Sequence, residues 1–372
     1  MLTLCRTVLV LLLAGASLAV GQELKQQYLG VASCQSSGCH GGGLRGEALI
    51  WKDKDIHTRR PLAILTTARS QRIAETLHLG EATKSARCTV CHAPFQALAP
   101  QAKSKIVQSD EVFSCETCHG PAESWIRSHT RPDFKYQNRL AVGMRDVKGV
   151  YARANNCVAC HENIEPALLD AGHPELVFEL SGKTVSEPPH WTQETDWVGV
   201  REWLTGQAVA LREVSWQLTK ANDPRSLARW KGLSWLLHHV SAQVPAVPQV
   251  SEPGANPGTG DFSNMQSLSD RVARAAAELS WSADKSRALL DKLASLDGSF
   301  AAAGDLLEQA HQAEALVQAL DRLAVSLRDK EKYVLKDEAF RALDKLFEDV
   351  RFPPDFKVAQ FTAHLREFRE KL

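Results

Sequence analysis

The sequence predicts a mainly α-helical protein in two parts, a first part with little regular structure and a second part that is an antiparallel helical bundle. Two observations support this prediction. All nine cysteines and most of the histidines lie before Trp191, in segments rich in glycine, proline and polar residues. After Trp191, apolar residues recur every three or four positions, which is the period of an amphipathic helix. A chain of 372 residues is long enough for two such domains.

The first residues have the features of an export signal. Arg6 precedes an apolar run at positions 8–20, which is short for a bilayer-spanning helix, and small residues for cleavage stand at positions 19–21. We therefore expect residues 1–21 to be a signal peptide, cleaved near Gly21, and the mature chain to be periplasmic. No later segment is apolar for long enough to be a transmembrane helix. Lys+Arg and Asp+Glu both total 44, so no basic excess indicates nucleic-acid binding.

Residues 22–193 contain four cysteine pairs, each followed directly by a histidine. Three pairs have the form Cys-x-x-Cys-His, and the first has four residues between its cysteines. In chain order the motifs comprise Cys34, Cys39 and His40; Cys88, Cys91 and His92; Cys115, Cys118 and His119; and Cys157, Cys160 and His161. Two thiols at this spacing form thioether bonds to the vinyl groups of one haem, and the histidine is placed to bind the iron. The sequence thus predicts four covalently bound haem c groups and a multihaem cytochrome domain.

Disulfides and structural zinc are the alternative uses of these cysteines. Disulfides are common in exported proteins, but they have no need of a histidine after each cysteine pair. Two Cys-x-x-Cys pairs complete one tetrahedral zinc site and leave the histidines without a role. With 13 histidines in the chain, four such placements by chance are roughly a one-in-a-million event. Haem is therefore favoured, and it also supplies the core that the loop-rich segments lack.

Several segments resemble the cytochrome c-554 family of ammonia-oxidising bacteria. They are residues 28–34, residues 51–57, residues 114–121 with Trp125 and His129, and residues 156–161. The resemblance covers residues 28–180 and is most specific in the Cys-Glu-x-Cys-His-Gly-Pro segment. Members of this tetrahaem family pass electrons from hydroxylamine oxidation toward membrane carriers. The chain departs from the family at Trp51-x5-His57, which is one residue longer, and at the first motif.

The resemblance implies a distal ligand for three of the four irons. These pairings are His129 with the haem on His40, His57 with the haem on His119, and His173 with the haem on His161. The haem on His92 is five-coordinate in the family, which makes it the candidate reactive iron. His78 and His190 are the candidates for closing that position.

A second histidine saturates an iron and suits it to electron transfer, whereas an empty position admits a small molecule. We therefore expect a periplasmic electron carrier rather than an enzyme, with a redox protein donor and acceptor. The partner classes expected for such a carrier are a multihaem oxidoreductase and a membrane quinone-linked cytochrome. One alternative is an oxidoreductase acting on a small nitrogen oxide or hydroxylamine at the haem on His92. Another is a structural subunit of a larger redox complex that docks through its C-terminal helices.

Residues 194–372 carry the helical pattern and no evident chemistry. The spacing predicts helices over about 196–218, 223–240, 265–283, 306–327, 337–350 and 356–371. Asp196 and Asp223 are predicted N-caps, and Asp297-Gly298-Ser299 is predicted to end one helix and cap the next. A Pro/Gly-rich linker is expected near residues 242–262. Six of the nine tryptophans, from Trp191 to Trp235, are expected to pack the bundle or to lie against haem edges.

Overall fold

The computed structural model describes residues 26–42, 46–188, 190–191, 197–254, 256–300, 305–328 and 335–372. Within these ranges the chain is mainly α-helical and has no strand, although an isolated bridge joins Tyr28 and Lys103. None of the helices described has both the length and the apolar character that a membrane crossing requires. The expected signal peptide and the predicted N-cap Asp196 lie outside the described residues.

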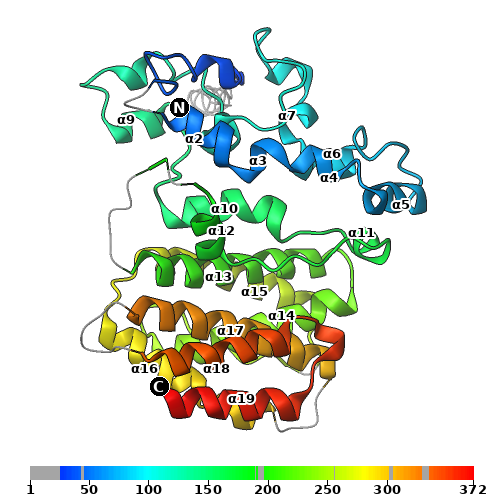
Figure 1. The fold of residues 1–372 in the computed structure, drawn as a ribbon, viewed down its shortest axis with the longest axis vertical. Coiled ribbons are helices and arrows are strands. Elements are labelled where there is room, and N and C mark those ends of the chain that lie inside the picture. The colour runs from blue at the N-terminus through cyan, green and yellow to red at the C-terminus, as the bar shows by residue number, and fades with distance from the viewer. Residues whose placement is uncertain are drawn as a thin grey trace, which may run out of the picture.

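The first part of the chain consists of short helices joined by loops (Figure 1). In chain order they are η1 (Val31–Ser33), α2 (Glu47–Lys54), α3 (Ile56–Arg59), α4 (Pro61–Ile64), α5 (Ala68–Thr76), α6 (Ala86–His92), α7 (Pro94–Ala97), η2 (Pro100–Ala102), α8 (Cys115–His119), η3 (Ser128–Thr130), α9 (Tyr136–Ala141), α10 (Val150–His161), α11 (Pro166–Asp170) and α12 (Leu180–Ser186). Three of the four cysteine–histidine motifs end a helix, because α6, α8 and α10 stop at the motif histidine.

The second part is built from longer helices that bury their apolar faces against one another. They are α13 (Val198–Leu218), α14 (Pro224–Gln243), α15 (Thr259–Ala277), α16 (Ala283–Ala294), η4 (Leu296–Phe300), α17 (Leu306–Leu327), α18 (Asp337–Val350), η6 (Pro353–Asp355) and α19 (Val358–Lys371). In Figure 1, α10 and α12 lie between these helices and the short helices of the first part. The buried core of the second part also includes Val150, Ala154 and Val158 of α10. The last cysteine–histidine motif therefore stands on a helix that packs against the bundle.

Several helix boundaries follow from local capping. Asp223 accepts a hydrogen bond from the backbone N–H of Ser226 at 2.8 Å and caps α14 as expected. The predicted cap at Ser299 is wrong, because residues 297–299 lie inside η4 and Asp305 caps α17. The apolar repeat from 265 to 283 is divided between two helices, since α15 ends at Ala277 and a new N-cap, Ser282, precedes α16.

The Pro/Gly-rich segment after α14 packs against that helix. Val247 and Val250 are buried in the common core. The Val250 carbonyl lies 2.8 Å from His238 Nδ1, and the Val250 N–H donates to Ser241 Oγ at 3.0 Å. These contacts hold the segment in place, so it does not behave as the free linker that its composition suggests.

Candidate haem-binding site

A cavity of about 1340 Å³ lies in the first part of the molecule and is lined by residues from all four motifs. The cysteines and histidines on its walls are Cys34, Cys39, His40, His57, Cys88, Cys91, His92, Cys115, Cys118, His119, His129, Cys157, Cys160, His161, His173 and His190. Five basic residues, Arg60, Arg69, Arg87, Arg139 and Lys183, also line it. Basic side chains in this position suit the propionates of haem. His78 is not among the described residues on these walls.

The third motif is held by the buried carboxylate of Glu116. This side chain is 0% exposed and accepts hydrogen bonds from the backbone N–H groups of Leu29 at 2.9 Å, Gly30 at 2.7 Å and Ala122 at 2.7 Å. Burial raises the pKa of Glu116, and the three N–H donors partly offset that effect. The glutamate in the Cys-Glu-x-Cys-His pattern thus joins the start of the described chain to the helix that presents Cys115 and Cys118.

The glycine that follows the third motif is required for steric reasons. Gly120 ends α8 with a φ of 81°, a left-handed conformation that side chains rarely adopt. A Cβ at this position would stand 3.2 Å from the carbonyl oxygen of Gly143. Arg145, two residues farther along that loop, donates to the carbonyls of Thr117 at 2.7 Å and Cys118 at 3.3 Å. The sharp turn after His119 therefore lets a second loop close over the motif.

Each motif histidine has a second histidine facing it across the cavity. The ring centroids are 6.1 Å apart for His40 and His129, 6.4 Å for His92 and His173, 6.5 Å for His119 and His190, and 6.2 Å for His161 and His57. The angles between the ring planes are 17°, 57°, 70° and 87° in the same order. The structure therefore groups eight of the histidines into four facing pairs.

The separations fit two imidazoles bound to opposite sides of one metal. An imidazole nitrogen binds a first-row metal at about 2 Å, and the ring centre lies roughly 1 Å beyond it, so two opposed ligands place their ring centres about 6 Å apart. The plane angle is unrestricted, since each ring can rotate about its metal–nitrogen bond. One histidine of each facing pair directly follows a cysteine pair in the sequence. The residues present therefore fit four haem c groups.

The histidine pairs in the structure coincide with the family resemblance at one position and differ from it at the others. His129 faces His40 as expected. His57 faces His161 and not His119, His173 faces His92, and His190 takes the place opposite His119. His173 thus lies opposite His92, the histidine whose haem has an open position in the family.

Local packing explains two of the changed pairings. Asp55 caps α3 by accepting from the backbone N–H of His57 at 2.8 Å and also lies 2.9 Å from His57 Nδ1, which fixes the ring. Near His173, Leu168 packs with Ile73 and Ile164 in one apolar cluster. The Leu168 carbonyl accepts the His173 backbone N–H at 2.9 Å. These contacts turn the loop after α11 toward α6, which ends at His92.

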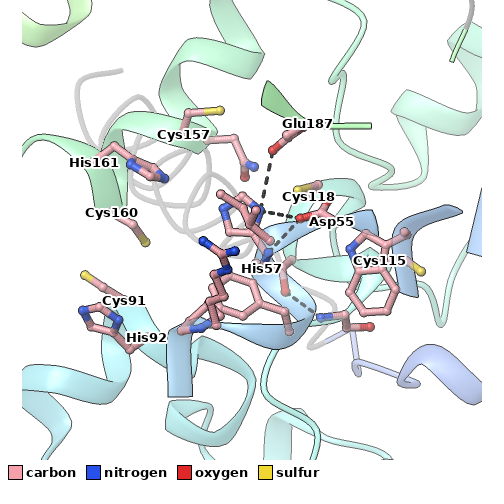
Figure 2. A pocket seen from close by; sticks show the side chains of 18 of the residues that line it. Asp55, His57, Cys91, His92, Cys115, Cys118, Cys157, Cys160, His161 and Glu187 are labelled. Carbon is pink, nitrogen blue, oxygen red and sulfur yellow. Dashed lines mark hydrogen bonds and ion pairs between the residues drawn. The ribbon is translucent and has the colours of Figure 1, made fainter. Parts of the chain in front are cut away.

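Thiols of different motifs also meet. The Cys34 side chain is hydrogen-bonded to Cys115, and the Cys91 side chain to Cys160. Figure 2 shows Cys91 and Cys160 pointing toward one another from α6 and α10. The first motif therefore adjoins the third, and the second adjoins the fourth.

In four of the eight facing histidines the pKa is lowered, which favours the neutral form that metal binding requires. Burial lowers the pKa of His119 to about 4, with His190 contributing, and burial also lowers the pKa of His161 to about 4. The pKa values of His92 and His129 are lowered by burial as well. These rings carry no charge near neutral pH and offer a lone pair to the cavity.

His57 differs from these four, because two carboxylates lie next to its Nδ1 (Figure 2). Asp55 Oδ1 lies at 2.9 Å and Glu187 Oε1 at 3.7 Å. Burial alone would lower the pKa of His57, but the hydrogen bond and charge of Asp55, with the charge of Glu187, raise it. Asp55, His57 and Glu187 also stand close enough to hold a metal ion among themselves. Ligation through the other ring nitrogen leaves Nδ1–H as a donor to Asp55.

Comparison with known proteins identifies one similarity. Residues 25–120 match the family model described as cytochrome c554 and c-prime, a range that contains the first three motifs. The match supports a c-type cytochrome family. A family of this kind implies covalently bound haem c, and the match suggests a haem-based role in electron transfer. No curated protein and no solved structure matches the chain.

The sequence patterns do not predict the positions of three residues of the site, His190, Asp55 and Glu187. The sequence indicates His190 only as a candidate for the haem on His92, and it does not indicate Asp55 or Glu187. The Asp-x-His spacing is a weak signal for Asp55, since an aspartate two residues before a histidine can cap a helix and reach the ring. No sequence signal brings Glu187 to His57, because the contact spans more than a hundred residues.

Proposed function

We propose that the chain is a periplasmic tetrahaem c-type cytochrome that transfers electrons between redox partners. Each of the four facing histidine pairs would hold one iron, and the cysteine pair beside it would attach the same haem. The observation that carries this proposal is the set of four ring separations between 6.1 and 6.5 Å. When bound, haem c supplies a one-electron couple at its iron.

The protein contributes ligands that stay in place during electron transfer. Two imidazoles leave no free position on the metal, so the coordination does not change with oxidation state. The neutral state of His119 and His161 lets them bind without losing a proton. The contacts between Cys34 and Cys115, and between Cys91 and Cys160, bring haem attachment points close together in two pairs.

The position of His173 favours a carrier over an oxidoreductase. An enzyme acting on a small nitrogen oxide or hydroxylamine needs an open iron, and the family resemblance offered only the haem on His92. His173 faces His92 at 6.4 Å. In this proposal, the bundle at 194–372 supports the fourth motif through α10. Residues 1–21 are proposed to be the signal peptide of the chain. Its partners are a redox protein donor and acceptor.

Electron paramagnetic resonance of the oxidised holoprotein tests the proposal. We expect four covalent haems per chain, all low-spin, with no new signal on addition of nitric oxide. Parallel ligand planes separate two of the iron d orbitals in energy, and perpendicular planes bring them together. The His40–His129 pair, at 17°, should therefore give the one rhombic signal, and the other three pairs should give signals with a large maximal g value. A high-spin population that converts with nitric oxide would contradict the proposal. His173→Ala is the positive control, because removal of this imidazole should leave the iron on His92 high-spin.

A further inference from the structure

The four histidine pairs differ in what their Nδ1 atoms contact. An imidazole that donates its remaining N–H to a carboxylate becomes a stronger electron donor to its metal and stabilises ferric over ferrous iron. A backbone carbonyl has the same effect to a smaller degree, because it carries no charge. An imidazole whose Nδ1 has no acceptor is the weakest donor of the three kinds.

The strongest contact belongs to His57, which faces His161. Its Nδ1 lies 2.9 Å from an oxygen of Asp55, and Asp55 is only 4% exposed. Glu187 adds a second carboxylate at 3.7 Å. Lys183 lines the same wall and Arg153 acts on Glu187, so part of this negative charge is offset, but Asp55 is the group in direct contact with Nδ1. Because these groups are largely withdrawn from water, solvent screens them weakly.

The opposite situation holds for His119 and His190. Their Nδ1 atoms are both buried and have no hydrogen-bond partner in the part of the chain that the structure describes. The charges near this pair have both signs, since Arg145 binds the carbonyls of Thr117 and Cys118 directly before His119, while the carboxylate of Asp55 acts on His190 and Cys118. The missing Nδ1 acceptors favour the ferrous state of an iron held by this pair, because neither ring is made a stronger donor by a hydrogen bond.

The two remaining pairs are intermediate. His40 Nδ1 lies 3.3 Å from Glu47, a solvent-accessible carboxylate, and His129 Nδ1 lies 2.6 Å from the Ile126 carbonyl. His173 Nδ1 contacts the Pro174 carbonyl at 2.8 Å. His92, which faces His173, is hydrogen-bonded to the backbone of Pro61. The Glu47 contact is longer than that of Asp55 and is screened by water.

We propose that Asp55 is a positioning residue that gives the iron between His57 and His161 the lowest reduction potential of the four, and that the iron between His119 and His190 has the highest. The inference rests on the proposed function, because it assumes that each pair binds one iron. A first electron entering the protein then resides mainly at the His119–His190 iron. The site on the bundle side, held by α10, is reduced last.

Asp55→Asn tests the first half in the haem-loaded full-length protein. Asparagine is an equally good helix cap, so α3 is retained, and its side-chain oxygen still accepts from Nδ1 while the charge is lost. A spectroscopic redox titration should show the lowest-potential component moving upward. We expect the ferrous-to-ferric ratio at fixed potential to rise about tenfold, equal to about 59 mV for one electron. Glu47→Gln is the matched control and should change a different component by less than about threefold, because its contact is longer and solvated.

His190→Met tests the second half, because it changes only the iron that faces His119. Exchange of imidazole for a thioether alters the potential of that iron and its low-spin signal. The component that changes should be the one with the highest potential in the unaltered protein. The proposal is overturned if Asp55→Asn leaves the lowest component in place, or if His190→Met alters any component but the highest. Failure of the proposed function is distinguished by the unaltered protein, which would then not contain four covalent haems that are all low-spin.

Discussion

The haem-binding region and the bundle differ in where their cores come from. In the bundle, large side chains such as Leu316, Leu320 and Phe361 are fully buried against one another. In the haem-binding region, the described apolar clusters are small, for example Leu65 with Ala74 and Ala82, and they stand around the cavity. The bundle therefore encodes its own core, whereas the first region is arranged around a space that side chains do not fill.

One chain therefore combines two sources of stability, a core of packed side chains in the bundle and a bound group in the first region. A loop-rich region of this length has little apolar surface to bury and depends on the group that fills its cavity. The helix α10 joins the two regions, because Cys160 and His161 line the cavity while Val150, Ala154 and Val158 belong to the bundle core. The experiments below test how independent the two regions are.

The largest expected effect is loss of structure in one region only. In full-length protein produced without haem attachment, we expect backbone amides before α10 to exchange as in an unfolded chain, because their core is missing. Amides of α13, α15 and α17 should remain protected, since their core is made of side chains. Hydrogen exchange followed by mass spectrometry measures both in one sample. Equal protection of the two regions would show that the first region folds without haem.

The same contrast explains which features the sequence predicts. Capping and apolar spacing are local, so α14 after Asp223, α17, α18 and α19 follow from short segments. Local signals fail where two interpretations compete. Asp297-Gly298-Ser299 resembles a helix end followed by a cap, yet tertiary packing of Phe300 holds the segment in η4.

The haem motifs are predictable because attachment requires cysteine and histidine within a few residues of one another. The facing histidines are harder, because they come from loops whose paths depend on distant contacts. His190 reaches His119 across about 70 residues, and no periodicity reports that approach. The family resemblance implies the neighbour that His129 has in the structure, whereas His57 and His173 lie opposite other motif histidines than it implies.

A buried ion pair between the regions should give the next largest effect. Arg229 of α14 donates to both carboxylate oxygens of Glu162, at 2.6 and 2.9 Å, and Glu162 directly follows His161. Arg229→Met leaves that buried carboxylate unpaired, which should cost about 3–5 kcal/mol of unfolding free energy. Chemical denaturation followed by circular dichroism and haem absorbance measures it.

The matched control is Arg351→Met, which removes an exposed ion pair with Glu348 and should cost less than about 1 kcal/mol. Leu320→Ala provides a second comparison, because it should destabilise the bundle by about 2–5 kcal/mol without touching the haem motifs. If Arg229→Met changes stability no more than Arg351→Met, the pair does not join the regions.

Glu116→Gln should have a smaller effect, confined to the haem-binding region. The amide group provides one acceptor oxygen but brings an NH₂ group toward N–H donors that the carboxylate satisfies, so a cost of about 1–3 kcal/mol is expected. Proteolysis near residues 26–30 should accelerate, because Leu29 and Gly30 lose their anchor. Glu123→Gln is the control, since Glu123 binds the same segment through Gln27 at an exposed site. Equal cleavage rates in the two variants would contradict the role of Glu116.

The smallest expected effect is a pH dependence at the junction of α10 with α13. Glu202 is 2% exposed and lies 2.7 Å from Arg153; burial raises its pKa from near 4.5 to about 7, although Arg153 partly opposes the shift. Between these values the folded protein binds a proton that the unfolded chain releases, so Glu202 stabilises the fold most below about pH 4.5. That contribution is lost as the pH rises to about 7, with a total on the order of 1–3 kcal/mol.

Glu202→Gln keeps a neutral side chain of the same shape and should remove this dependence. The difference in urea midpoint between about pH 5 and pH 8 should therefore be smaller in the variant than in the unaltered protein. Other carboxylates titrate equally in both proteins and cancel in the comparison. If the two proteins lose the same stability over this range, Arg153 already holds Glu202 ionised at pH 5. The junction would then be a permanent ion pair, and α10 would be attached to the bundle equally at both pH values.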